Sequence, residues 1–285
     1  MDAGSETLVD FHTHSHHSDG VLAPVQLVER ARGRGVSMLA LTDHDTTDGL
    51  DEAAAACVGA AIRFVAGVEL SASWRGQTIH IVGLQIDAEH AGLRTHVGQV
   101  RARRQARLGE IGERLEKRAR LPGRELAAEA AACAAPTRLH LARLLVTRGF
   151  ARDTQEAFDR WLNRNTAGHV PAEWPALDQA MTVLSDSGGR AVLAHPHRYR
   201  FSAGQLRELT AAFVQHGGAA LEASMAGMSP NDAERIASLC RRFGLHASMG
   251  SDFHDPAVPW NPLGRWLKLP AGLRPVTELL NTLPR

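Results

Sequence analysis

The feature that most constrains this chain is a recurring pair of elements: a short apolar run with strand character, followed at once by histidine or carboxylate residues. The first such run, Thr7 to Phe11, leads into D-F-H-T-H-S-H-H-S-D-G at 10–20, and the second leads into T-D-H-D at 42–45. Because side chains alternate along a strand with a period of two, His12 and His14 point to the same side and can bind one ion. Imidazole and carboxylate together are ligands that borderline divalent metals favour.

The same arrangement recurs in later parts of the chain. The further residues of this kind are Glu69 in the run Ile62 to Leu70, His80 in Thr78 to Ile86, His195 and His197 after Arg190 to Leu193, and Asp252 and His254 after 246–250. Any one of them alone could be a core histidine or a surface carboxylate. Their repetition favours a β/α barrel, in which the carboxyl ends of the strands meet on the face that carries the active site.

Helical patterns alternate with the strands at both ends of the chain, which predicts βα units with parallel strands. The helices expected there are Pro24 to Arg34, 49–60, Leu177 to Asp186, 203–215 and 230–243, and two further strands are expected at 219–223 and 245–249. The middle of the chain has helical patterns without strands, at Val97 to Arg120, Arg138 to Thr147 and Thr154 to Leu162. We therefore expect a barrel formed by 1–94 and 176–285, with a small helical cap inserted at 95–175.

The composition is that of a soluble enzyme with one main core, because 44% of the 285 residues are hydrophobic and no run is long enough to span a membrane. The N-terminus lacks a signal-peptide pattern, so we expect the mature chain to begin near Met1. The cysteines Cys57, Cys133 and Cys240 are scattered, which predicts small core residues in a reducing cytoplasm. A formal net charge of +1 argues against non-specific binding to long nucleic acid, and no stable protein partner is expected.

On its motifs the chain resembles the polymerase and histidinol phosphatase (PHP) family of the amidohydrolase superfamily. The matching motifs are D-F-H-T-H…S-D-G at 10–20, L-T-D-H-D at 41–45, G-V-E at 67–69, H-I-V-G-L at 80–84, A-H-P at 194–196 and G-S-D-F-H at 250–254. The motifs occur in this order along the chain, and none of them falls within roughly residues 95–175. The resemblance implies an α/β fold, a distorted (β/α)7 TIM-like barrel with an inserted helical subdomain.

The resemblance also implies a centre of two to three divalent ions. The first ion would be held by His12, His14, Glu69 and Asp252, the second by Glu69, His80 and His195, and the third by Asp19, His44 and His254. Glu69, His195 and Asp252 are the expected catalytic residues. The resemblance alone favours Mn²⁺, and Zn²⁺ or Fe²⁺ are alternatives because the ligand set mixes imidazole with carboxylate and has no cysteine.

Within the family the chain is most similar to phosphoesterases that act on nucleoside 3′,5′-bisphosphates and on the 5′ ends of short RNA. This implies a small nucleotide substrate, hydrolysis of its 3′-phosphate (pAp to AMP and phosphate), and, as an extension, action on 5′-phosphorylated RNA or DNA ends. The expected phosphate contacts are Arg138 and His140, in a segment resembling the subgroup pattern R-x-H-x-A-R, and His197 and Arg198. One departure leaves the exact substrate open: Arg164 to Val170 stands where the subgroup carries G-K-P-x-Y-V.

Three alternatives remain. The chain could be a histidinol-phosphate-type monoester phosphatase, a proofreading nuclease domain of a replicative polymerase, or a non-catalytic metal-stabilised binding module. The short chain weighs against the polymerase, and the complete ligand set weighs against the binding module. Asp43 and Asp45 either orient the ligands or lie on the surface, and His16 and His17 are expected in a solvated loop.

Overall fold

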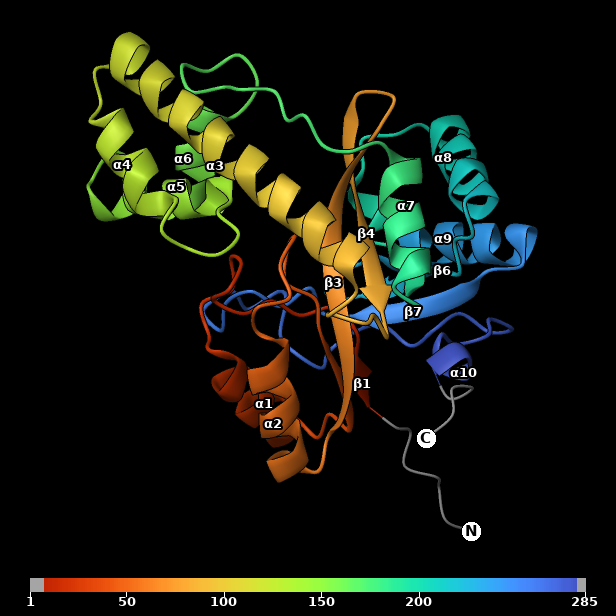
Figure 1. Ribbon diagram of the computed structural model, residues 1–285. Coiled ribbons are helices and arrows are strands. Elements are labelled where there is room, and N and C mark those ends of the chain that lie inside the picture. Colours follow the sequence, from red (N-terminus) through yellow and green to blue (C-terminus); the bar gives the residue numbers. More distant parts are fainter. Residues whose placement is uncertain (1–7, 281–285) are drawn as a thin grey trace.

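The computed structural model describes residues 8–280, and its centre is a seven-stranded sheet that curls into a barrel (Figure 1). The strands are β1 (Val9–Asp10), β2 (Met38–Leu41), β3 (Arg63–Trp74), β4 (Gln77–Leu84), β5 (Arg190–Leu193), β6 (Ala220–Met225) and β7 (His246–Gly250), bonded in sequence order. The first and last strands approach each other: the Phe11 amide donates to the Met249 carbonyl at 3.1 Å, and the Asp252 amide to the His12 carbonyl at 2.8 Å. The predicted distorted seven-stranded barrel is confirmed.

The expectation of parallel strands throughout is wrong for β4, which pairs antiparallel with both β3 and β5. Arg75 and Gly76 join β3 to β4, and both have positive φ, 48° and 72°. This is the backbone of a two-residue hairpin turn, and so short a connection cannot cross over to a parallel strand. His80 is consequently not at the carboxyl end of its strand: it pairs with Ser71 midway along the hairpin, which projects upward in Figure 1.

Helices cover the outside of the barrel, with α1 and α2 on one side and α7, α8 and α9 on another (Figure 1). Their bounds are α1 Pro24–Gly33, α2 Leu50–Ala60, α7 Leu177–Asp186, α8 Ala203–Gln215, α9 Pro230–Phe243 and α10 Thr277–Leu280, with a 3₁₀ turn at Pro196–Arg198. The longer helices each bury an apolar stripe; in α9 the buried residues Ala233, Ile236, Ala237 and Cys240 recur at spacings of three, one and three. Ile236 and Cys240 join the main core with β-strand residues such as Leu70.

The middle of the chain forms helices only, which pack into a core of their own around residues such as Leu108, Leu126 and Leu145. These helices are α3 Ala91–Ala119, α4 Gly123–Ala130, α5 Arg138–Thr147 and α6 Thr154–Ala157, followed by a π-helix at Phe158–Leu162. Sequence analysis missed α4 and expected one regular helix over 154–162. The division into barrel and cap at residues 95 and 175 stays a prediction, and α3 begins slightly before it.

The cysteines were expected to be small core residues. Cys57 and Cys240 are buried, as expected, while Cys133 is half-buried. None of the three forms a disulfide. Among the helices of residues 8–280, none is both long and apolar enough to cross a membrane.

Candidate metal centre

All of the predicted metal ligands meet at one end of the barrel, and Glu69 lies at their centre. The distances from Glu69 Oε2 are 3.1 Å to His12 Nε2, 3.3 Å to His14 Nε2 and 3.0 Å to His44 Nδ1, and those from Oε1 are 3.0 Å to His80 Nδ1 and 3.0 Å to His195 Nε2. Glu69 itself is fully buried. The β3 strand thus carries one carboxylate to a point that loops after β1, β2 and β5 also reach.

Two further carboxylates complete the cluster. Asp252 Oδ1 lies 3.4 Å from His12 Nε2 and 3.2 Å from His14 Nε2. Asp19 Oδ1 lies 3.1 Å from His254 Nε2, and its Oδ2 lies 3.9 Å from His44 Nε2. His44 therefore faces Glu69 with one ring nitrogen and Asp19 with the other, whereas sequence analysis placed it with Asp19 and His254 alone.

The donor atoms of this cluster fit divalent cations better than they fit one another. Six of them are buried and make no hydrogen bond: His12 Nε2, His14 Nε2, His44 Nδ1, His80 Nδ1, Glu69 Oε2 and Asp19 Oδ1. Buried polar atoms in proteins are nearly always paired, so a convergent set without partners points to an ion. The atoms form three overlapping groups, each within 4.8 Å: His12, His14 and Glu69; His44, Glu69 and His80; and His14, Asp19, His44 and His254.

The ionisation states of Glu69 and His44 favour metal binding. Burial would raise the pKa of Glu69, but the imidazoles of His44, His12 and His80 hold that pKa well below its usual range. Burial lowers the pKa of His44 to about 3 against the opposing effect of Glu69. At neutral pH the central carboxylate is therefore ionised and the His44 ring is neutral, which are the protonation states that metal ligands require.

Glu222 supports two of the ligands, and sequence analysis missed it. This buried residue of β6 accepts from His12 Nδ1 at 2.7 Å through Oε1, and its Oε2 accepts from the backbone amide of His195. The contact fixes the His12 tautomer with Nε2 directed at Glu69, the usual role of a carboxylate behind a metal-binding histidine. The sequence feature that could have pointed to Glu222 is that it is a lone carboxylate inside the apolar run 219–223.

Asp43 and Asp45 are both buried, so the surface alternative for them is wrong. Asp43 accepts from the Ser15 amide at 2.8 Å, from Ser15 Oγ at 2.6 Å and from Ser18 Oγ at 2.5 Å. These bonds hold the loop that carries His14 and Asp19 at its ends. His16 in that loop is exposed, as expected, and His17 is half-buried.

Three residues at the ligand cluster have a strained backbone. His195, Asp252 and Asp45 have φ of 32°, 53° and 47°, in the left-handed region that non-glycine residues seldom adopt. Such residues cluster at functional sites because the surrounding structure must impose them. Here the strained backbone turns the side chains of His195 and Asp252 towards the ligand cluster.

A cleft of about 260 Å³ connects the ligand cluster to the cap. Its walls include Asp19, His44, His80, Arg104, Arg107, Arg138 and Trp174. Arg104 is buried and paired: its Nε and Nη2 donate to Asp45 Oδ2 at 2.8 and 2.5 Å, and Nη2 also donates to Ser71 Oγ.

Arg107 and Arg138 line this cleft without a carboxylate partner among residues 8–280. Arg107 donates to the Val170 carbonyl at 2.9 Å, and Arg138 donates to the Leu162 carbonyl at 3.2 Å and lies over the Phe158 ring. Burial, with Arg138 and Arg104 nearby, lowers the pKa of Arg107 to about 10, so it remains charged at neutral pH. Two half-buried guanidinium groups without a counter-charge are suited to bind an anion.

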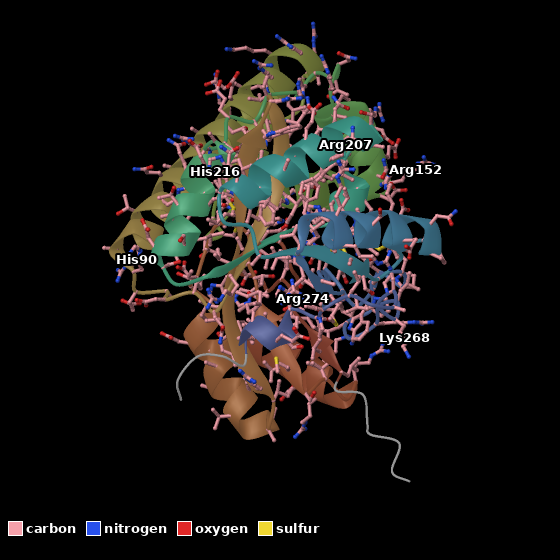
Figure 2. All side chains as sticks on the ribbon, turned by 90° about the vertical axis from the view of Figure 1, so that its right-hand side faces the viewer. His90, Arg152, Arg207, His216, Lys268 and Arg274 are labelled. Carbon is pink, nitrogen blue, oxygen red and sulfur yellow. The ribbon has the colours of Figure 1, made fainter. Side chains whose placement is uncertain are left out.

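The other predicted substrate contacts lie elsewhere. His140 Nδ1 bonds the Thr137 amide at 3.0 Å, within the N-terminal cap of its own helix α5. Arg198 pairs with Asp252 Oδ2, so it directly contacts one of the predicted metal ligands. His197 follows the strained His195 and is half-buried, and burial beside Arg198 lowers its pKa to about 4. Their contacts with a substrate stay predictions. Two further histidines, labelled in Figure 2, lie at helix ends: His90 at the start of α3 and His216 at the end of α8.

Comparison with known proteins agrees with this geometry. The family model of the PHP domain matches residues 10–163. The chain is 45% identical to the 5′-3′ exoribonuclease Rnm of Salmonella typhimurium, over 97% of this chain and 95% of that protein. It is 38% identical to the 3′,5′-nucleoside bisphosphate phosphatase of Chromobacterium violaceum, over 94% of each. A metal-dependent phosphoesterase structure from Bifidobacterium adolescentis, described as putative, superposes with a TM-score of 0.81 at 29% identity, covering 91% of this chain and 92% of that one.

These matches and the convergent ligand set lead to one conclusion. The chain belongs to the PHP family and is a metal-dependent hydrolase of phosphoester bonds.

Proposed function

We propose that this hydrolase removes the 3′-phosphate of nucleoside 3′,5′-bisphosphates and cleaves short 5′-phosphorylated oligonucleotides by the same reaction. The observation that carries the proposal is the cleft shared by the ligand cluster and the carboxylate-free pair Arg107 and Arg138. One phosphate would lie at the ligand cluster and a second at the arginine pair. A monoester such as histidinol phosphate has no second phosphate for the arginines.

Divalent ions held by the nine ligand residues would supply a nucleophilic water at neutral pH and polarise the phosphate oxygens. The chain's own residues would position the substrate. Arg107 and Arg138 would hold the 5′-phosphate, with Trp174 beside Arg107. The hairpin residues Ser71 and His80 line the same cleft and would border the sugar.

The reaction balances in the same way for both substrates. Water adds its oxygen to phosphorus, the bond from phosphorus to the 3′-oxygen breaks, and a proton passes to that oxygen. A bisphosphate gives a nucleoside 5′-phosphate and inorganic phosphate. An oligonucleotide gives a nucleoside 5′-phosphate and a remainder that carries a new 5′-phosphate, so the remainder can bind again. The exoribonuclease and bisphosphatase named among the relatives would then differ in substrate and share one reaction.

The test compares kcat/KM for adenosine 3′,5′-bisphosphate with that for adenosine 3′-monophosphate, in wild type and in Arg138→Ala. Since a charge-assisted contact is worth about 1.5–3 kcal/mol, wild type should prefer the bisphosphate about ten- to a hundredfold, and the variant should lose most of this preference. Arg160→Ala is the control, because Arg160 lies in the same part of the cap but contacts Trp161. Equal rates for the two substrates in wild type would reject the two-phosphate arrangement.

A further inference from the structure

One large aromatic side chain is exposed in the long loop between β7 and α10. Among residues 8–280 the exposed large hydrophobic residues are Val21, Val25, Val58 and Trp260, and Trp260 alone is aromatic, with 67% of its surface accessible. Single exposed aliphatic residues are ordinary on protein surfaces. An exposed indole is costly to leave in water, so its surroundings are informative.

Trp260 borders a cavity of about 340 Å³. The cavity is lined by residues that follow β6, namely Met225, Ala226 and Gly227, and by residues that follow β7, including Pro259, Pro262 and Arg265. Its volume is at the lower end of the range for small-ligand pockets. The two prolines beside Trp260 restrict the backbone of this loop, which limits the freedom of the indole.

The cavity is adjacent to the metal centre. Met225 pairs with Gly250 across β6 and β7, and Asp252 follows Gly250 by two residues. The Met225 backbone is therefore one strand spacing, about 4.8 Å, from Gly250, and one residue separates Gly250 from Asp252. A molecule bound at the metal ligands and longer than one nucleotide would extend from Asp252 towards this cavity.

The topology also sets the direction in which a longer substrate must extend. The arginine pair lies over β3 and β4, on the cap helices α3 and α5. In the closed sheet order, β6 and β7 lie across the barrel from β3 and β4. If the 5′-phosphate of an oligonucleotide lies at the arginines and its next phosphate lies at the metal ligands, the remaining nucleotides must leave on the β6–β7 side.

We propose that Trp260 and Arg265 form a subsite for an oligonucleotide, where the indole stacks on the base of the second or third nucleotide. The proposal rests on the proposed function and adds the feature that separates oligonucleotides from bisphosphates. Stacking on an aromatic ring accepts any base, as an exonuclease requires. Arg265 is exposed, and no carboxylate among residues 8–280 pairs with its side chain, so it can contact a following phosphate. Lys268, further along the same segment, projects outward at the right of Figure 2.

The experiment measures kcat/KM in manganese-loaded enzyme for adenosine 3′,5′-bisphosphate and for a 5′-phosphorylated RNA trinucleotide that begins with adenosine. Trp260→Ala should lower the ratio of the trinucleotide value to the bisphosphate value about five- to a hundredfold. Trp260→Phe keeps an aromatic face and should retain most of the ratio. Val58→Ala, at an exposed position on α2, is the matched control and should leave the ratio unchanged.

Trinucleotides with an abasic second or third residue locate the stacked base. Removing that base should cost wild type the factor that Trp260→Ala costs, and the two losses should not add. An abasic penalty that persists in Trp260→Ala, or an equal loss on both substrates, would overturn the subsite. A wild-type enzyme that cleaves only the bisphosphate would also overturn it while leaving the bisphosphatase intact. Failure of the Arg138→Ala comparison would instead reject the proposed function.

Discussion

Glu222 offers a sharp test of how the metal centre is built. Its Oε1 accepts from His12 Nδ1 at 2.7 Å and its Oε2 accepts from the His195 amide, and Glu222 and His12 are both buried. Glu222→Gln preserves the shape but replaces one acceptor oxygen with a donor NH₂ group. Whichever way the amide is turned, a donor then faces either the His12 ring or the His195 amide.

The magnitude follows from this one mismatched hydrogen bond. A buried donor left without an acceptor costs about 1–3 kcal/mol, so the metal-free variant should unfold more easily by that free energy. Loss of a supporting carboxylate behind a ligand histidine typically costs 10- to 100-fold in metal affinity, and we expect Glu222→Gln to weaken Mn²⁺ binding by about this factor. The first effect concerns folding, and the second concerns the orientation of two ligands.

The assay combines Mn²⁺ titration calorimetry with urea unfolding in the presence of chelator. Glu208→Gln is the control, because Glu208 is an exposed partner of Arg75 and should change neither quantity measurably. Mn²⁺ affinity equal to wild type in a folded Glu222→Gln protein would show that Glu222 does not orient His12 and His195.

Three further predictions concern the same centre and the cysteines. Asp252→Asn should lower the rate of phosphate release by more than about a hundredfold and leave the circular dichroism spectrum unchanged. The substitution removes the charge from Asp252 Oδ1, which lies 3.2 Å from His14 Nε2. A near-normal rate would place the chemistry elsewhere. Burial opposes protonation of His254, yet Asp19 and Asp252 raise its pKa to about 9 in the metal-free protein. The interaction of protonated His254 with Asp19 and Asp252 therefore stabilises the metal-free fold. This stabilisation is complete below the unfolded-state pKa of about 6.5 and is lost as pH rises through 9. Mn²⁺ affinity should rise over the same window with proton release, measured by calorimetry in buffers of different ionisation enthalpy; binding without proton release contradicts this. Burial raises the pKa of Cys57 and Cys133 to about 11 and of Cys240 to about 12. The thiols of the native protein should therefore react slowly with a thiol reagent at pH 8, and those of the denatured protein should react quickly. Rapid labelling of the native protein would refute the burial of these thiols.

The ligand positions were predictable because each is a local feature of the sequence. His12, His44 and Asp252 each come just after an apolar run, and strand geometry alone brings such residues to one end of a barrel. The hairpin could also have been predicted, since Arg75-Gly76 sits between two apolar runs with strand character. Its consequence for β4 was missed because the alternation of strands and helices elsewhere favoured parallel pairing.

The supporting residues could not be selected from sequence. Glu222 bonds His12 across 210 residues, and only the folded barrel brings them together. Arg107 is one of several arginines on a long charged helix, where a solvated face was the natural expectation. Its position in the cleft depends on how the cap docks, because the Val170 carbonyl and the Trp174 ring draw it inward.

The docking of the cap explains how two phosphate sites could be kept at one separation. The buried pair of Arg104 with Asp45 joins α3 to the residue after His44, and Arg104 also bonds Ser71, two residues from Glu69. Arg143 donates to the Asp19 carbonyl, which ties α5 to the ligand loop. Because the same helices α3 and α5 carry Arg107 and Arg138, the proposed anion site would be fixed relative to the predicted metal ligands by a buried ion pair on α3 and a part-buried hydrogen bond on α5. Breaking a buried ion pair leaves an uncompensated charge and costs about 3–5 kcal/mol, so the spacing is costly to change. Selectivity for two phosphates would then be a property of the interface between cap and barrel, and the arginines alone would not be enough to produce it.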